Sequence, residues 1–177
     1  MTLKEYLNLD RMDYWPFFSK GRLMDWLIRP DQWWVREYVR FLRKEEYYTF
    51  HRKNKLLMYY YRRRKNILGS RLGFYMSAGN FGPGLKIYHY GPIHVHPDAK
   101  IGKNCTLHSS CSIGTKGTYP PEYPTIGDNV DIGLGAKIFG PVTIADGVRI
   151  GGGSVVTKSI LEPGVTVVGV PARIIEK

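Results

Sequence analysis

The chain has 177 residues, of which 43% are hydrophobic and 23% charged, a composition that excludes a disordered protein and favours one substantial soluble domain. The formal net charge of +11 favours a negatively charged partner, and no uncharged apolar run approaches the roughly 18 residues of a membrane span. Two cysteines and an N-terminus without the apolar core of a signal peptide predict a cytoplasmic protein without a disulfide framework.

Residues 1–72 are rich in tryptophan, tyrosine and arginine, and we expect this region to be helical. From Asp31 to Lys65, apolar side chains recur at near-helical spacing between basic residues, which predicts one long or two shorter amphipathic helices. Their basic face is either a solvated surface or a contact with another subunit or with the inner face of the membrane. No nucleic-acid-binding motif accompanies the basic run 62–65, so nucleic acid is not an expected partner.

The second region, 73–177, carries a six-residue repeat of aliphatic side chains. The repeated positions are Val95, Ile101, Leu107, Ile113, Ile126, Ile132, Ile138, Ile144, Ile150 and Val156. A six-residue unit corresponds to one short strand and a tight turn, because a helix repeats about every 3.6 residues and a strand alternates about every 2. The wider spacing between Ile113 and Ile126 indicates a loop insertion at 115–125.

Such hexads predict a parallel β-helix, in which stacked repeats place like side chains in columns inside a three-sided prism. Four positions after each aliphatic residue comes a small or modest residue, which fits the crowded corner of the prism. Cys105 and Cys111 fall in this slot and are interpreted as small core residues rather than metal ligands. The predicted fold class is therefore mainly β, a parallel β-helix with an N-terminal α-helical region.

Three stretches of the second region resemble the hexapeptide-repeat acyltransferases: "GLKIYHYGPIHVHPDAKIGKNC", "GLGAKIFGPVTIADGVRIGGGSVVTK" and "GVPARII". Within that family the chain is most similar to the serine acetyltransferase-like branch, which includes enzymes that O-acetylate bacterial surface polysaccharides. The resemblance covers residues 73–177. It implies a left-handed parallel β-helix, a homotrimer with active sites between neighbouring subunits, and acetyl-CoA as co-substrate without a metal.

The motif that holds the catalytic histidine of the serine acetyltransferases corresponds to "YHYGP" here, so the resemblance implies that His89 is the catalytic base. A histidine suits this role because its ordinary pKa lies near neutrality. His89 also stands six residues before Val95, where the repeat expects an aliphatic side chain, and a structural histidine stays open as the alternative. His108 follows Leu107 and is expected to point outward, where it binds the acceptor, assists the base or simply faces solvent.

The positions that bind serine in that branch differ in this chain. Tyr88 stands where the acidic residue precedes the histidine, and Glu122 and Tyr123 stand where an Arg-His pair follows the inserted loop. These departures favour a sugar hydroxyl over serine as the acceptor. The inserted loop is expected to reach over a neighbouring subunit and to shape the acceptor pocket.

For the cofactor, the resemblance implies that the pantetheine arm runs along small residues and that two cations meet the nucleotide phosphates, since a cation pairs well with phosphate. The small residues are Gly135, Ala136, Gly152 and Gly153, and the cations are Lys158 and Arg173.

These observations predict an acetyl-CoA-dependent O-acetyltransferase that acts on a sugar hydroxyl of a capsular, exo- or O-antigen polysaccharide or of its precursor. Two alternatives stay open. One is a serine O-acetyltransferase of cysteine biosynthesis, and the other is a non-enzymatic β-helix scaffold whose basic helices bind a partner.

Overall fold

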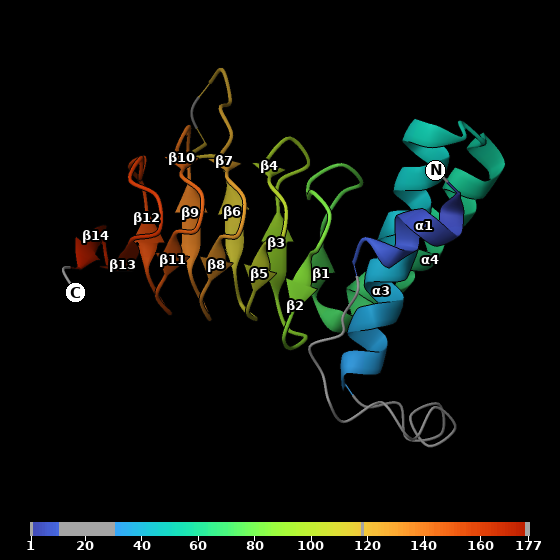
Figure 1. Ribbon diagram of the computed structural model, residues 1–177, viewed down its shortest axis with the longest axis horizontal. Helices are drawn as coiled ribbons and strands as arrows, with labels where there is room; N and C mark the ends of the chain where they lie inside the picture. The colour runs from blue at the N-terminus through green and yellow to red at the C-terminus, as the bar shows by residue number, and fades with distance from the viewer. Residues whose placement is uncertain (1, 11–30, 118, 176–177) are drawn as a thin grey trace.

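The computed structural model describes residues 2–10, 31–117 and 119–175, so parts of the predicted helical region (1 and 11–30) and residue 118 of the loop lie outside the described chain. The helices stand at one end of a long prism of short strands, and the last strands, β13 and β14, lie at the other end (Figure 1). Within the described residues, no helix is both long enough and apolar enough to cross a bilayer.

Within its described residues, the helical region contains two main helices, where the sequence predicted either one long helix or two shorter ones. They are α3 (Asp31–Glu46) and α4 (Lys55–Leu72), preceded by the short α1 (Leu3–Asn8) and separated by a π-helical turn, η2 (Tyr47–His51). The side chain of Asn54 caps α4 by accepting the N–H of Leu57, and Gly73 ends it in the left-handed conformation. The buried face of α3, centred on Tyr38 and Leu42, packs into the same apolar cluster as the first strands of the prism.

A buried charge cluster attaches α3 to the start of the prism. The Arg43 guanidinium pairs with Asp10 and with Glu46, and it donates to the backbone carbonyls of Phe81 at 2.9 Å and Gly82 at 2.6 Å. Burial alone would lower the pKa of Arg43, but the carboxylates of Glu46 and Asp10 more than reverse this and hold the guanidinium charged. The helices are therefore joined to the first coil by charge-assisted hydrogen bonds.

The strands wind into three faces, and all neighbouring strands pair in parallel except the last two, β13 and β14. The β3 face holds β1 (Phe74–Tyr75), β3 (Ile93–Val95), β6 (Ser112–Gly114), β9 (Lys137–Phe139) and β12 (Val155–Val156). The β4 face holds β4 (Lys100–Ile101), β7 (Thr125–Ile126) and β10 (Thr143–Ile144). The β2 face holds β2 (Lys86–Ile87), β5 (Thr106–Leu107), β8 (Asp131–Ile132), β11 (Arg149–Ile150), β13 (Thr166–Gly169) and the antiparallel β14 (Ala172–Ile175).

The predicted aliphatic columns are confirmed. All ten repeated positions are buried, and strand pairing aligns them in register, as for Leu107, Ile132 and Ile150 on the β2 face. The small-residue slot is also buried from Ala99 to Ser154, with one exception, because Gly117 lies exposed in the inserted loop. Cys105 and Cys111 are buried free thiols, and burial raises the pKa of Cys111 to about 11. The cysteines are therefore core residues, as predicted.

Candidate functional site

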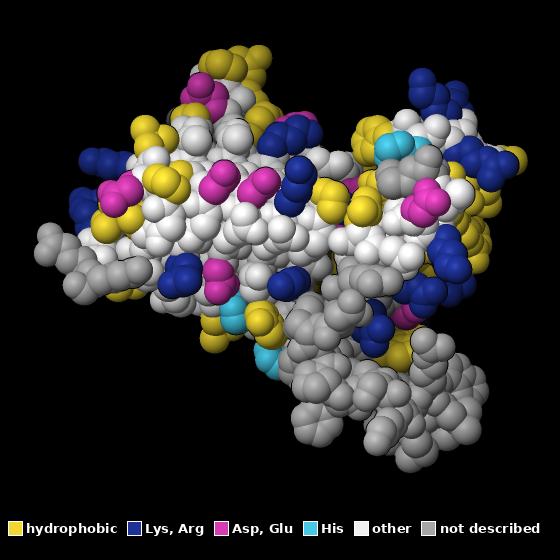
Figure 2. Space-filling model, viewed as in Figure 1, with side chains coloured by type: hydrophobic (Ala, Val, Ile, Leu, Met, Phe, Trp, Pro, Cys, Tyr) yellow, Lys and Arg dark blue, Asp and Glu magenta, His cyan; other side chains and the backbone are white. Residues whose placement is uncertain are grey.

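One edge of the prism, here called the histidine edge, is formed by the turns that lead from the β2 face to the β3 face (residues 88–92, 108–111, 133–136 and 151–154). Backbone hydrogen bonds stack these turns: the N–H of Gly135 donates to Ser109 O at 3.0 Å, and the N–H of Gly153 donates to Leu134 O at 2.7 Å. Figure 2 shows histidine side chains gathered beside hydrophobic ones at the lower border of the β-helix. The edge brings His89 and His108 onto the same line as Gly135, Gly152 and Gly153.

His89 lies outside the prism, which corrects the expectation that it replaces an aliphatic side chain of an interior column. The interior places around it are filled by Ile87, Ile93 and Val95, all buried, whereas His89 is exposed. The chain takes eight positions from Ile87 to Val95, against six between the corresponding residues of the next coil, Leu107 and Ile113. The two additional residues widen this turn and push His89 outward.

The turn that holds His89 is seated on the coil below it. Gly91 has a positive φ of 138°, which residues other than glycine rarely adopt, and it lies so close to Ser109 that an added Cβ would be 3.0 Å from the Ser109 Cβ. From the other side, the Gln32 side chain of α3 donates to the Tyr88 carbonyl at 3.3 Å. Within the described residues the His89 side chain makes no hydrogen bond, so its ring is free to meet a substrate.

Tyr88, His108 and Asp131 form a contiguous polar group next to His89. The rings of Tyr88 and His108 stack with centroids 4.9 Å apart, and His108 Nε2 lies 3.3 Å from Asp131 Oδ1. These residues come from three successive coils of the β2 face, Tyr88 and His108 directly after β2 and β5, and Asp131 at the start of β8. Two of them were predicted as acceptor-binding residues, and the structure does bring them together.

Asp131 was missed by sequence reasoning. It is an outward-facing residue directly before an interior isoleucine, at a place held by Lys86, Thr106 and Arg149 in the neighbouring strands. The sequence did contain a signal for Asp131 as a site residue. It is a carboxylate at an outward position that the neighbouring strands fill with cationic or neutral residues, and it follows an outward histidine by one coil.

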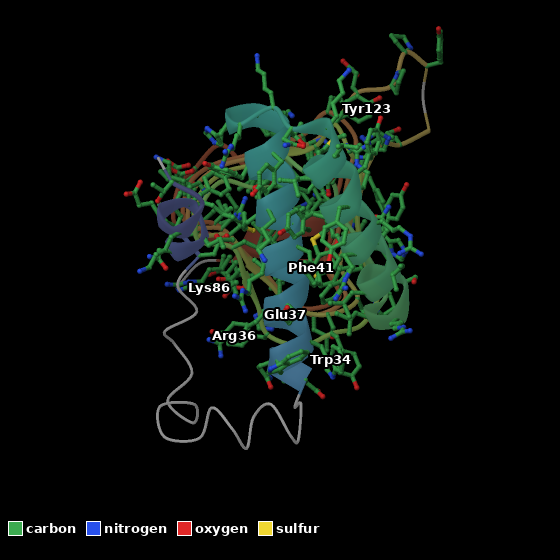
Figure 3. The ribbon with its side chains drawn as sticks, turned by 90° about the vertical axis from the view of Figure 1, so that its right-hand side faces the viewer. Trp34, Arg36, Glu37, Phe41, Lys86 and Tyr123 are labelled. Atoms are coloured by element: carbon green, nitrogen blue, oxygen red, sulfur yellow. The ribbon has the colours of Figure 1, made fainter. Side chains whose placement is uncertain are left out.

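Glu122 and Tyr123 lie on a second edge, here called the loop edge, where turns lead from the β3 face to the β4 face. The inserted loop leaves the prism there, and the Tyr123 ring stacks on His96 with centroids 4.4 Å apart. Desolvation and the neighbouring Asp98 carboxylate raise the pKa of Tyr123. Figure 3 shows Tyr123 and Lys86, which begins β2, on opposite sides of the prism. Within a single chain, Glu122 and Tyr123 are therefore not brought to His89.

The predicted cofactor residues divide between several places. Gly135, Gly152 and Gly153 lie on the histidine edge, whereas Lys158 is exposed on the loop edge after β12 and Arg173 lies in β14. The side chain of Ala136 is fully buried inside the prism, so only its backbone is available to a ligand at the edge. Within the described chain, no cluster of three or more His, Cys, Asp or Glu side chains is arranged to hold a metal ion.

No protein-family model matches the chain. Among curated proteins, it is similar to serine acetyltransferase of Buchnera aphidicola, with 40% identity over 102 residues that cover 56% of this chain and 39% of the relative. It is also similar to serine acetyltransferase of Mycobacterium tuberculosis, with 37% identity over 90 residues that cover 50% of this chain and 39% of the relative. The chain thus spans about two fifths of the length of these relatives.

Among solved structures, serine acetyltransferase from Brucella abortus superimposes with a TM-score of 0.74 and 28% identity, covering 97% of this chain and 68% of that one. Soybean serine acetyltransferase complexed with serine gives a TM-score of 0.76 and 23% identity over 98% of this chain and 69% of that one. A serine acetyltransferase in complex with CoA gives a TM-score of 0.73 and 21% identity, with 98% and 69% covered. These matches confirm the left-handed parallel β-helix and the resemblance to hexapeptide-repeat acyltransferases.

The expectation of a polysaccharide acceptor is corrected by these comparisons. The relatives and structures described above are serine acetyltransferases. The likeness therefore favours serine as the acceptor, the alternative that was ranked below a sugar because of Tyr88, Glu122 and Tyr123. Those departures were read as changes of substrate. Two of the three have a local structural partner, since the Tyr88 ring stacks on His108 and the Tyr123 ring stacks on His96.

Proposed function

We propose that this protein is an acetyl-CoA-dependent O-acetyltransferase that transfers the acetyl group to the hydroxyl of serine. The observation that carries the proposal is the histidine edge, where an exposed His89 lies in line with the stacked small-residue turns at Gly135 and Gly152–Gly153. The chain is also 40% identical over 102 residues to a serine acetyltransferase, which supports serine as the acceptor.

Acetyl transfer requires a base, because a serine hydroxyl is a weak nucleophile until its proton is removed. In this proposal His89 accepts the hydroxyl proton while the oxygen attacks the thioester carbonyl of acetyl-CoA. The tetrahedral intermediate then expels the CoA thiolate. His89 donates the proton that it took from serine to this thiolate, and CoA leaves as the thiol. The products are O-acetylserine and CoA, and no atom or electron is left over.

The same edge offers groups that suit the thioester. The backbone N–H groups of Leu134 and Gly152 make no hydrogen bond within the described residues, so they are available to the carbonyl oxygen or to the pantetheine amides. Gly152 has no side chain to obstruct this approach, and a Cβ there would lie 3.2 Å from Leu134 O. Lys158 and Arg173, both outside this edge, are assigned to the nucleotide phosphates because each presents a cation on the surface near the end of the prism.

The separation of the two edges leads us to propose a homotrimer. The histidine edge carries the base and the small residues, whereas the loop edge carries Glu122, Tyr123 and Lys158. If three prisms stand side by side about a common axis, the histidine edge of one faces the loop edge of the next. Each active site is then completed by the inserted loop of a neighbouring subunit, which gives the loop its role at the acceptor.

The test is to measure the release of thiol from acetyl-CoA by the full chain with L-serine and without it. We expect serine-dependent release, and His89→Gln should lower kcat by about 10²- to 10⁴-fold, the usual contribution of a general base. Glu162→Gln serves as the control, because Glu162 is an exposed titratable residue on the third edge of the prism, away from the histidine edge. No thiol release with serine, or full turnover by His89→Gln, would overturn the proposal.

A further inference from the structure

The contact between His108 and Asp131 joins an imidazole and a carboxylate that are held in place but still partly open to solvent. Asp131 Oδ1 is shielded from solvent and accepts no hydrogen bond within the described residues, and His108 Nε2, 3.3 Å away, is the nearest cationic group to it among them. The side chain of His108 nevertheless remains 34% exposed and that of Asp131 46% exposed, so the rest of each group is accessible. A shielded carboxylate oxygen without a donor is costly, and His108 Nε2 is the group placed to serve it.

Tyr88 fixes the plane of the histidine. Its ring lies against the His108 ring at 4.9 Å with an interplanar angle of 21°, a stacked arrangement that restricts rotation of the imidazole. The backbone of Tyr88 is in turn held by Gln32 of α3. His108 and Asp131 therefore present an imidazole and a carboxylate side by side, in a fixed orientation, next to the turn that carries His89.

A free amino acid presents the complementary arrangement, because its ammonium and its carboxylate are attached to the same carbon atom. A carboxylate and an imidazole at the distance of a single contact suit such a zwitterion in antiparallel fashion, with the ammonium on the carboxylate and the carboxylate on the imidazole. A neutral sugar hydroxyl has no use for this pair. Another carboxylate on this side of the molecule is that of Asp31, because it directly precedes Gln32, whose side chain donates to the Tyr88 carbonyl.

We propose that His108 and Asp131 form the anchor for the zwitterionic end of the acceptor, with Asp131 taking the ammonium and His108 the carboxylate. Tyr88 is a positioning residue that holds the His108 ring. This inference rests on the proposed function, and it names the residues that select an amino acid as the substrate. With both charges held here, the side chain of serine is the part left to reach His89.

The test compares three acceptors: L-serine, 3-hydroxypropionate, which lacks the ammonium, and ethanolamine, which lacks the carboxylate. Asp131→Asn should raise the KM for serine about tenfold to a hundredfold with a smaller change in kcat, since a hydrogen bond to a charged group is lost. It should also abolish the preference for serine over 3-hydroxypropionate and leave the preference over ethanolamine. His108→Gln should do the reverse, losing the preference over ethanolamine alone.

Two controls make the outcome decisive. Glu162→Gln removes a remote carboxylate and should leave all three acceptors unchanged, whereas Asp31→Asn tests the competing carboxylate. If Asp31→Asn, and not Asp131→Asn, raises the KM for serine, or if both acceptor preferences survive in both anchor variants, the proposed anchor is wrong.

A binding measurement separates this inference from the proposed function. Serine added to the full chain without acetyl-CoA should shift the side-chain NMR signals of His108 in the wild type and not in Asp131→Asn. Binding of this kind without any acetyl transfer would support the anchor and overturn the proposed reaction. Acetyl transfer to serine with His108 signals that do not respond would support the reaction and overturn the anchor.

Discussion

The two regions of the molecule differ in the polar side chains that they bury. The interior of the prism is apolar from Val95 to Val167, with Ser154 as a buried polar residue among the regular coils. Within its described residues, the helical region buries four charged side chains in addition to its apolar face. These are Arg43, Glu45, Glu46 and Lys65. The prism is therefore stabilised by a repeated apolar pattern, whereas the helices combine an apolar face with a few individual ion pairs.

This difference has a structural reason. Successive coils of the prism are nearly alike, so apolar contact alone does not distinguish one docking position of the helices from another. Arg43 bonds to the carbonyls of Phe81 and Gly82, and Lys65 pairs with Glu45 at 2.9 Å and bonds to Met76 O at 2.9 Å. A misplaced helix would leave these charges buried without partners, which is strongly unfavourable. The ion pairs thus favour one docking position.

The largest effect is expected from breaking this docking. Arg43→Met should lower the free energy of unfolding by about 3–5 kcal/mol, because Asp10 and Glu46 lose their buried partner. Urea denaturation followed by circular dichroism measures the change. Arg40→Met is the matched control, since Arg40 pairs with Glu37 at the surface of the same helix and should cost less than about 1 kcal/mol. Equal effects of the two substitutions would contradict the contrast between the regions.

A smaller effect is expected from a cavity in the prism. Ile132→Ala removes a fully buried side chain from a column and should cost about 2–5 kcal/mol, depending on how far the coils collapse around it. Leu134, two residues later, is 57% exposed, so Leu134→Ala should change the stability by no more than about 0.5 kcal/mol. Thermal or urea unfolding distinguishes them, and a cost at Leu134 as large as at Ile132 would refute the assignment of inside and outside.

The smallest effect tests how closely the coils approach one another. A Cβ at Gly133 would lie 2.6 Å from Ile150 O on the next coil, so Gly133→Ala should cost about 1–3 kcal/mol through displaced backbone. At Gly114 no atom outside its chain neighbours lies within 4 Å of an added Cβ, so Gly114→Ala should be nearly neutral. If the two alanine variants unfold at the same urea concentration, the coils are less tightly stacked than the structure indicates.

Much of the fold was predictable because its signal is local and repeated. Every interior aliphatic from Val95 to Val156 was identified from spacing alone, and the interruption before Ile126 placed the inserted loop. The helices were predicted less completely, since the break between α3 and α4 depends on the π-helical turn and on the Asn54 cap, which leave little trace in an apolar pattern. The charge cluster was not predicted, because Asp10 and Arg43 are far apart in the sequence.

The candidate site shows the same limit. His89 and the glycines of the histidine edge were proposed from resemblance, and the structure places them on one line. The sequence wrongly placed His89 in an interior column. Two additional residues between Ile87 and Val95 shift the repeat at this point, and a search for six-residue spacing does not detect such a shift. Asp131 was missed because its significance comes from a side chain 23 positions earlier in the chain, His108.

The sequence by itself determined which side chains of the prism face inward, because burial of an aliphatic at every sixth position is the one arrangement that removes all of them from water. Only the tertiary structure decided what meets on the outside. The neighbours of an outward side chain belong to other coils, and their alignment depends on turn lengths, ring stacking and ion pairs that form only once the coils are stacked. For that reason the core of this protein is evident in its repeat, whereas the pair that we assign to its acceptor is evident only in the folded chain.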